Sequence, residues 1–298
     1  MRYIIIAITT LIVLGSCAKE SDTAIDPSED GAVKFANAQI ASRTEGSSWV
    51  DGDEVGIYMS DADNALDDNR TNVRYTTDAA GNFSVYSGVT PIYYPQSTTD
   101  EVTFNAYYPY SDDLSNDRVT IDVSKQNGGG QGAVDFMVAE INNSVKQVGI
   151  ERFEFYHSLS MLVLNLTHNS EITTFDGMVT KVEDINTVAS FDVLTGDIYG
   201  DSSSPGEVIF GIDSVADDGS EMSISAILLP EDLSAGTVIK FIQGADLYTL
   251  TLSDDLVLAK GTRYTYGVVV GRDTVLVTGD SEIEDWNEEM TDNLYAKE

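Results

Sequence analysis

The sequence predicts an all-β protein built from two consecutive β-sandwich domains. Short runs rich in Val, Ile, Tyr, Phe and Thr recur along the chain, and these residue types suit pleated, half-buried strands. Turn-forming residues, among them 24 glycines, separate the runs at short intervals. No long stretch shows the i, i+3, i+4, i+7 apolar spacing of an amphipathic helix. These observations favour sandwiches over a parallel α/β sheet.

Length and composition narrow the class of protein further. A chain of 298 residues is natural for two sandwiches, and its apolar fraction of 42% is enough to fill two cores. The single cysteine excludes an intrachain disulfide. The formal net charge of −34 repels phosphate backbones, so we expect no nucleic-acid partner. Such a charge is typical of a soluble domain outside the cell.

The first sixteen residues have the pattern of a secretory signal peptide. Arg2 is followed by an apolar run over residues 3–14, which is shorter than the roughly 20 residues that a membrane-spanning helix needs. The run ends in Leu-Gly-Ser-Cys, which resembles a bacterial lipobox, and this predicts lipidation of Cys17 by acyl chains such as palmitate. An ordinary signal peptide followed by an incidental cysteine is the alternative.

Residues 17–32 are predicted to be a lipidated tether. Residues 18–22 (AKESD) partly resemble the tag that directs Bacteroidetes lipoproteins to the outer face of the outer membrane. The remaining tether is polar and offers little to bury. We therefore expect an outer-membrane, cell-surface location.

Residues 33–149 are predicted to form the first domain and residues 150–298 the second. Strands are expected in the first at 33–40, 54–59, 73–75, 83–86, 102–108 and 119–123, and a mobile glycine-rich loop at 127–132. The second opens with a strand from Phe155 to Thr167, apolar on both faces at first and so expected to be central. Later strands are expected at 191–193, 208–211, 222–229, 238–243, 248–252, 264–270 and 274–277.

Three sequence blocks resemble one known family. They are Ser42-Arg43-Thr44 with Trp49 and DGDEVGIYM at 51–59; FYHSL at 155–159; and AILLP at 226–230 with Gly236, Tyr248, Leu256, Gly261, Tyr264, Tyr266 and IEDW at 283–286. In order and spacing they are similar to the fimbrillin-like family of surface lipoproteins, over roughly residues 33–287. The glycines also have a physical role, because Gly52 and Gly261 suit turns that lead into strands.

The resemblance implies two transthyretin-like sandwiches and no catalytic activity. In fimbrial members an arginine- or lysine-specific protease removes an N-terminal strand, and a strand of the next subunit fills the groove. Arg43 follows the predicted strand at 33–40, so it is the candidate processing site; an ordinary exposed arginine is the alternative. The charged tail after Trp286 makes a poor donor strand, which favours a tip or accessory subunit.

We find no pattern of an enzyme and expect no cofactor. The two histidines, His157 and His168, fall in or beside one predicted strand, and no nucleophile elbow, zinc motif or phosphate-binding loop is present. Two acidic clusters could in principle bind calcium, but a solvated acidic loop is the simpler interpretation of each. They are Asp61, Asp63, Asp67 and Asp68, and Asp280, Glu282, Glu284 and Asp285.

The predicted function is therefore that of a non-catalytic fimbrial subunit acting in adhesion and pilus assembly. Its expected partners are the outer membrane, other subunits that associate by strand addition, and an adhesion ligand on a host or bacterial surface. The alternative is a surface glycan-binding lipoprotein that does not polymerise. That alternative needs exposed aromatic rings at Trp49, Trp286, Tyr93-Tyr94 and Tyr107-Tyr108, whereas their positions in strand motifs favour burial.

Overall fold

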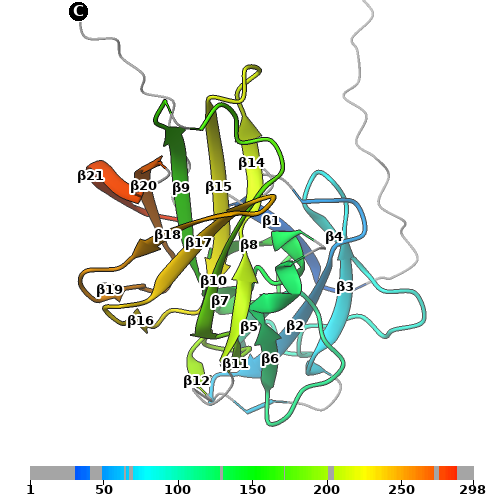
Figure 1. The fold of residues 1–298 in the computed structure, drawn as a ribbon. Coiled ribbons are helices and arrows are strands. Elements are labelled where there is room, and N and C mark those ends of the chain that lie inside the picture. The colour runs from blue at the N-terminus through cyan, green and yellow to red at the C-terminus, as the bar shows by residue number, and fades with distance from the viewer. Residues whose placement is uncertain are drawn as a thin grey trace, which may run out of the picture.

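The computed structural model describes residues 31–40, 49–63, 65–66, 70–127, 130–170, 172–200, 205–271 and 275–286. Over these ranges the protein is all-β, as predicted, with a barrel on one side and a pair of stacked sheets on the other (Figure 1). Cys17 and Arg43 both lie outside the described residues. Within the described ranges, no helix has the length and apolarity needed to cross a membrane.

Seven strands close the barrel. In spatial order they are β1 (Lys34–Ile40), β4 (Asn82–Val85), β3 (Val73–Thr77), β2 (Glu54–Asp61), β5 (Glu101–Tyr108), β7 (Met137–Val145) and β8 (Ile150–His157). The β1–β8 pair is parallel, whereas the other neighbouring pairs are antiparallel. Buried and exposed residues alternate in these strands. In β8 every second residue is buried, including Phe153, Phe155 and His157.

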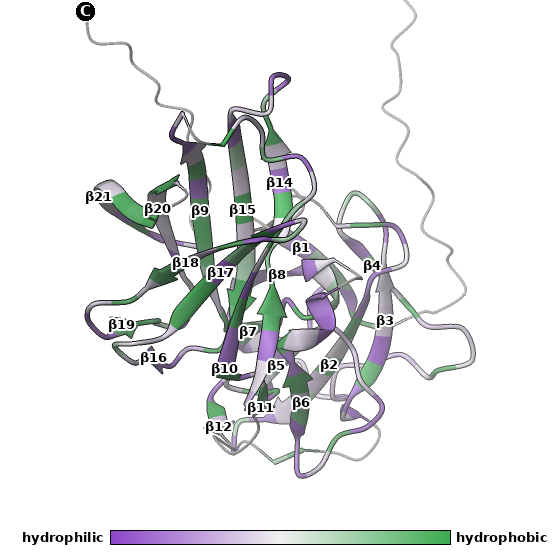
Figure 2. Cartoon of the chain, viewed as in Figure 1, coloured by the Kyte–Doolittle hydropathy of each residue, from purple (hydrophilic) through white to green (hydrophobic). Residues whose placement is uncertain are grey.

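Two further sheets stack face to face. One has the order β14 (Gly211–Val215), β15 (Glu221–Leu228), β9 (Ser160–His168), β20 (Thr262–Val270) and β21 (Val275–Asp285). The other has the order β13 (Pro205–Ile209), β10 (Met178–Asn186), β17 (Val238–Gln243) and β18 (Asp246–Thr251). Apolar and polar segments alternate along β9 and β15 (Figure 2). The apolar residues of both sheets join one core, which makes this part a sandwich.

Short elements connect the barrel to the sandwich. In one small sheet β11 (Val188–Asp192) pairs with β12 (Ile198–Gly200) and with β6 (Arg118–Asp122), a strand from the first half of the chain. Two 3-10 turns follow β6, at Val123–Gln126 and Gln131–Ala133, and β16 (Asp232–Leu233) pairs with β19 (Leu256–Val257). The sheets therefore cross the expected boundary at residues 149 and 150, because β8 completes the barrel and β6 joins β11.

Two separate clusters of buried side chains form the cores. One fills the barrel and includes Phe35, Trp49, Phe104 and Phe153. The other fills the sandwich and extends under the connecting sheet, where Phe136 and Phe191 pack with ring centroids 5.0 Å apart. Two cores are what the composition predicts for a chain of this length.

Most predicted strands are confirmed in position, with several differences. The single strand predicted from Phe155 to Thr167 is two strands, β8 and β9, which are separated at residues 158–159 and belong to different sheets. The strand predicted at 208–211 spans the end of β13 and the start of β14, and the short strands β12, β16 and β19 were not predicted. β7 and β10 were missed, because their Asn, Glu, Lys and Asp residues obscure the alternation of buried side chains. β21 extends to Asp285, well beyond the predicted end at residue 277. The expected loop at 127–132 is partly outside the described residues, and the 3-10 turns bracket it. Gly52 and Gly261 have positive φ angles of 91° and 66°, as their predicted turns require.

Candidate functional site

The first strand, β1, is enclosed between two other strands of the barrel. It pairs with β8 in parallel at six positions, from Lys34 opposite Ile150 to Ile40 opposite Phe155. On its other side it pairs with β4 at two positions, Phe35 opposite Phe83 and Ala36 opposite Asn82. The β1 backbone therefore occupies a slot that would otherwise leave β4 and β8 as open sheet edges.

The side chain of Phe35 anchors β1 in this slot. Its ring lies 5.5 Å from that of Tyr75, 5.1 Å from that of Phe104 and 5.4 Å from that of Phe153, measured between centroids. The Phe35 side chain is almost fully buried. Edge-to-face and stacked contacts of this kind add to the free energy gained from burial alone.

Trp49 is the first described residue after β1, and its side chain is part of the barrel core. Its indole contacts Phe83, Tyr108 and Phe155 at centroid distances of 5.7, 5.5 and 5.2 Å. The segment that contains Arg43 thus joins two buried anchors, β1 before it and Trp49 after it. A cut after Arg43 would leave Trp49 covalently attached to the barrel and would free β1 from it.

A buried carboxylate lies in β8 beside β1. Glu151, which is in register with Phe35, accepts hydrogen bonds from the hydroxyls of Tyr94 and Ser144 and from the amide of Gln147. Burial, together with the hydrogen bond to Glu151, raises the pKa of Tyr94 to about 12. These bonds satisfy the carboxylate and tie β8 to β7 and to the loop that carries Tyr94.

The barrel and the sandwich also meet through His157. Its Nδ1 lies 2.7 Å from Oδ1 of Asp135, and both side chains are completely buried. Its ring stacks on the indole of Trp286, which follows β21. The prediction that His157 is a structural residue agrees with this packing. His168 packs beside Phe175, and its Nδ1 lies 2.9 Å from the carbonyl oxygen of Asn169.

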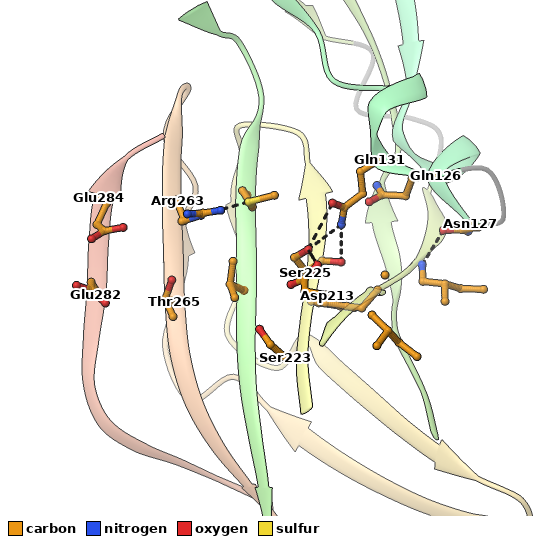
Figure 3. Close-up of a pocket in the computed structure, with 17 residues that line it drawn as sticks. Gln126, Asn127, Gln131, Asp213, Ser223, Ser225, Arg263, Thr265, Glu282 and Glu284 are labelled. Carbon is orange, nitrogen blue, oxygen red and sulfur yellow. Dashed lines mark hydrogen bonds between the residues drawn. The ribbon is translucent and has the colours of Figure 1, made fainter. Parts of the chain in front are cut away.

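A pocket of about 940 Å³ lies on the outer face of the five-stranded sheet (Figure 3). Its floor is formed by Met161 and Val163 of β9. One wall consists of the 3-10 turns after β6, together with β13 and β14, and the opposite side is β20 and β21. The labelled polar residues around it are Gln126, Asn127, Gln131, Asp213, Ser223, Ser225, Arg263, Thr265, Glu282 and Glu284.

Amide side chains attach one wall of the pocket to the sheet. Gln126 accepts a hydrogen bond from the Ile227 backbone N–H and donates one to the Ile227 carbonyl, at 2.9 and 2.6 Å. Asn127 bonds in the same two-sided way to the Ile209 N–H and the Glu207 carbonyl. Gln131 donates to the backbone carbonyl and the hydroxyl of Ser225. These side-chain amides bond to backbone groups that a neighbouring strand would otherwise pair with. The wall is therefore fixed to the sheets by several hydrogen bonds.

The charged residues of the pocket lie mainly on β20 and β21. Arg263 is opposite Glu284 and Thr265 is opposite Glu282 in the antiparallel register. Burial raises the pKa of Glu284, and the neighbouring Glu282 raises it further. Burial also raises the pKa of Asp213 on the far side, where Ser225 donates a hydrogen bond to its carboxylate.

The aromatic residues that the glycan-binding alternative requires do not form an exposed platform. Trp49, Trp286, Tyr94, Tyr107 and Tyr108 are all buried, as their strand positions predicted. Tyr93 differs from its neighbours, with 39% of its surface exposed. Sugar binding by a row of stacked aromatic rings therefore has no support from these residues.

The first acidic cluster shapes a turn. Oδ1 of Asp61 accepts hydrogen bonds from the backbone N–H groups of Asp63 and Ala65, both at 2.9 Å. Asp67 and Asp68 lie outside the described residues. Among the residues that the structure describes, no three His, Cys, Asp or Glu side chains are grouped so as to hold a metal ion.

The fold and the site define an all-β protein whose first strand is enclosed in a barrel and whose sandwich carries a polar pocket. The sequence model of the fimbrillin-like family matches residues 42–286. The chain belongs to the fimbrillin-like family, as its sequence blocks indicated.

Individual relatives agree with this assignment. A protein named as a candidate fimbrium subunit, Fim1C, of Bacteroides uniformis is 26% identical over 300 residues, which cover 95% of this chain and 94% of that protein. A crystal structure of a candidate cell adhesion protein from Bacteroides uniformis has 28% identity and a TM-score of 0.69, covering 86% of this chain and 98% of the other.

A third relative supports the fold. The crystal structure of a candidate cell adhesion protein from Bacteroides ovatus has a TM-score of 0.72 at 24% identity, covering 87% of this chain and 98% of the other. The arrangement of barrel and sandwich therefore has a counterpart among solved structures.

Proposed function

We propose that this chain is a non-catalytic fimbrial subunit of the cell surface, which acts in adhesion and assembles by accepting a strand in the slot of β1. Family membership supports the class of protein. The observation that carries the mechanism is the enclosure of β1 between β4 and β8, immediately before the segment that contains Arg43.

The slot has the two properties that strand addition needs. Removal of β1 would expose backbone N–H and C=O groups along β4 and β8, which a new strand can pair with. It would also vacate the space that the Phe35 ring fills among Tyr75, Phe104 and Phe153. An incoming strand would bind best with a large apolar side chain at the position of Phe35.

Delivery to the cell surface belongs to the same proposal. Residues 1–16 act as a lipoprotein signal peptide, Cys17 carries the acyl chains in the outer membrane, and residues 17–32 serve as the tether. The barrel and the sandwich correspond to the two transthyretin-like domains of the family. We expected these domains at 33–149 and 150–298, and β8 from the second range completes the barrel. The position proposed for the subunit is a tip or accessory one, in which it accepts a strand and donates none.

Cleavage by an arginine-specific protease tests the proposal. The chain from residue 18 onward, which contains every described residue, is treated and run on a gel without boiling, with Arg43→Ala as the matched control. We expect a cut after Arg43 in the parent chain and none at that site in the control. Cleavage without an oligomer ladder supports a strand acceptor, and a ladder indicates a self-polymerising shaft subunit. An uncut Arg43 under conditions that cleave other arginines would contradict processing.

A further inference from the structure

The pocket in Figure 3 contains two kinds of polar group, those already engaged and those still available to a ligand. The amides of Gln126 and Asn127 are occupied by backbone partners, and Gln131, Ser225 and Asp213 are linked to one another. These groups shape a rigid wall. The amide and hydroxyl donors among them are already used, so this wall offers few donors to a ligand.

The available groups are concentrated on the opposite side, on β20 and β21. Arg263 and Thr265 lie beside Glu284 and Glu282 as direct cross-strand neighbours (Figure 3). The Arg263 Nε donates a weak hydrogen bond to the Met161 sulfur, 3.4 Å away. Among the described residues, no carboxylate lies within ion-pair distance of this guanidinium. A strong donor and two strong acceptors therefore line one side of the pocket without a direct ion pair between them.

The position of Arg263 beside Glu282 and Glu284 weakens the binding of simple ions on this side of the pocket. A cationic ligand bound to Glu282 and Glu284 would lie next to Arg263, and an anion bound to Arg263 would lie next to the carboxylates. A neutral ligand that both donates and accepts hydrogen bonds meets neither repulsion. Adjacent hydroxyl groups do this, because one hydroxyl can donate to a carboxylate while its neighbour accepts from the guanidinium.

We propose that this pocket binds a neutral polyhydroxylated ligand, namely a sugar residue of a surface glycan. Arg263, Thr265, Glu282 and Glu284 form its hydrogen bonds, above a floor in which Met161 and Val163 are buried. A volume of about 940 Å³ lies within the roughly 300–1,000 Å³ range of small-molecule sites and accommodates more than one sugar ring.

This site deepens the adhesion part of the proposed function, on which it rests, and is independent of the assembly part. The pocket lies on the outer face of the sandwich, whereas β1 lies in the barrel. Glycan binding, which the sequence suggested on the basis of aromatic residues, is thus assigned to a different set of side chains. Loss of sugar binding would leave strand acceptance at β1 intact, and the reverse also holds.

Methionine methyl NMR tests the proposal directly, because Met161 forms the pocket floor. The chain from residue 18 onward is labelled at its methionine methyl groups and titrated with methyl α-mannoside, methyl β-galactoside, N-acetylglucosamine and lactose. We expect a saturable shift of the Met161 signal with at least one sugar. The signals of Met59 in the barrel and Met178 in the sandwich should remain unchanged.

Variants and a competing probe make the result decisive. Arg263→Gln and Glu282→Gln should each weaken sugar binding by about tenfold or more, whereas Glu140→Gln, an exposed change on the barrel, should not. Unchanged Met59 and Met178 signals show that each variant is folded. A Met161 shift with spermidine but with none of the sugars would overturn the proposal, and so would sugar shifts that both pocket variants leave unaltered.

Discussion

The imidazole of His157 lies flat against the indole of Trp286, with ring centroids 3.9 Å apart and planes within 4° of parallel. His157 is the last residue of β8 in the barrel, and Trp286 directly follows β21 in the sandwich. The Trp286 backbone N–H also donates to the Gly261 carbonyl at 2.8 Å. This stack therefore fastens the end of the described sandwich to the barrel strand that borders β1.

Trp286→Ala should lower the free energy of unfolding by about 3–5 kcal/mol, the usual cost of removing a buried tryptophan. Chemical denaturation followed by circular dichroism measures the change. Leu276→Ala in β21, the strand that Trp286 follows, is the matched control, because Leu276 is 55% exposed and its loss should cost much less. Equal losses in the two variants would show that the stack contributes nothing beyond an ordinary surface contact.

Gln126→Ala should destabilise the protein by about 2–4 kcal/mol, because it leaves both backbone polar groups of Ile227 without their partner in a buried site. Equilibrium unfolding in urea measures the loss. The neighbouring Lys125→Ala removes an exposed side chain and should leave stability within about 0.5 kcal/mol of the parent. A neutral Gln126→Ala would mean that water replaces the amide at this wall.

Stability should fall as the pH rises from 10 to 12, in part because of Tyr94. Burial raises the pKa of Tyr94 to about 12 in the folded protein, above the ordinary tyrosine value of 10.0, so the folded state retains a proton that the unfolded state loses. The contribution of Tyr94 to the free energy of unfolding amounts to about 2–3 kcal/mol. It is fully present below pH 10 and is lost as the pH rises from 10 to 12. In urea melts at pH 9 and 11.5, Tyr94→Phe should lose less stability between the two values than the parent. An identical loss would contradict the assignment.

Phe35→Ala should weaken the hold of β1 in its slot. The change removes three ring contacts and should cost about 3–5 kcal/mol of stability. Hydrogen exchange of the β1 amides, followed by mass spectrometry, should accelerate relative to the β9 amides of the sandwich. Lys34→Ala, an exposed change on the same strand, provides the control. Equal acceleration in β1 and β9 would indicate global loosening rather than release of the slot.

The sequence predicted the local features well because they are encoded by neighbouring residues. The turn at Gly52, the central strand containing Leu162 and Leu164, and the burial of Trp49 all follow from short patterns. The contacts between distant residues could not be predicted in this way. His157 and Trp286 are far apart in sequence, and the parallel pairing of β1 with β8 depends on how the whole barrel closes.

The pocket was missed for the same reason. Arg263 and Glu284 become neighbours through the β20–β21 pairing, and Gln126 reaches Ile227 across 101 positions of the chain. Glu282 and Glu284 belong to an acidic cluster in the sequence, but nothing in the sequence places an arginine beside them. The amide-rich segment before the glycines at 128–130 was the one signal that could have indicated a structured wall.

Exchange of the first strand after cleavage tests the central claim most directly. The chain from residue 18 onward is cut after Arg43 and mixed with an excess of an isotope-labelled peptide spanning residues 31–43, and the complexes are weighed by native mass spectrometry. We expect the labelled strand to replace its unlabelled counterpart in the cut protein and not in the intact Arg43→Ala variant. A cut barrel that incorporates no labelled strand, however long it is incubated, would contradict strand acceptance.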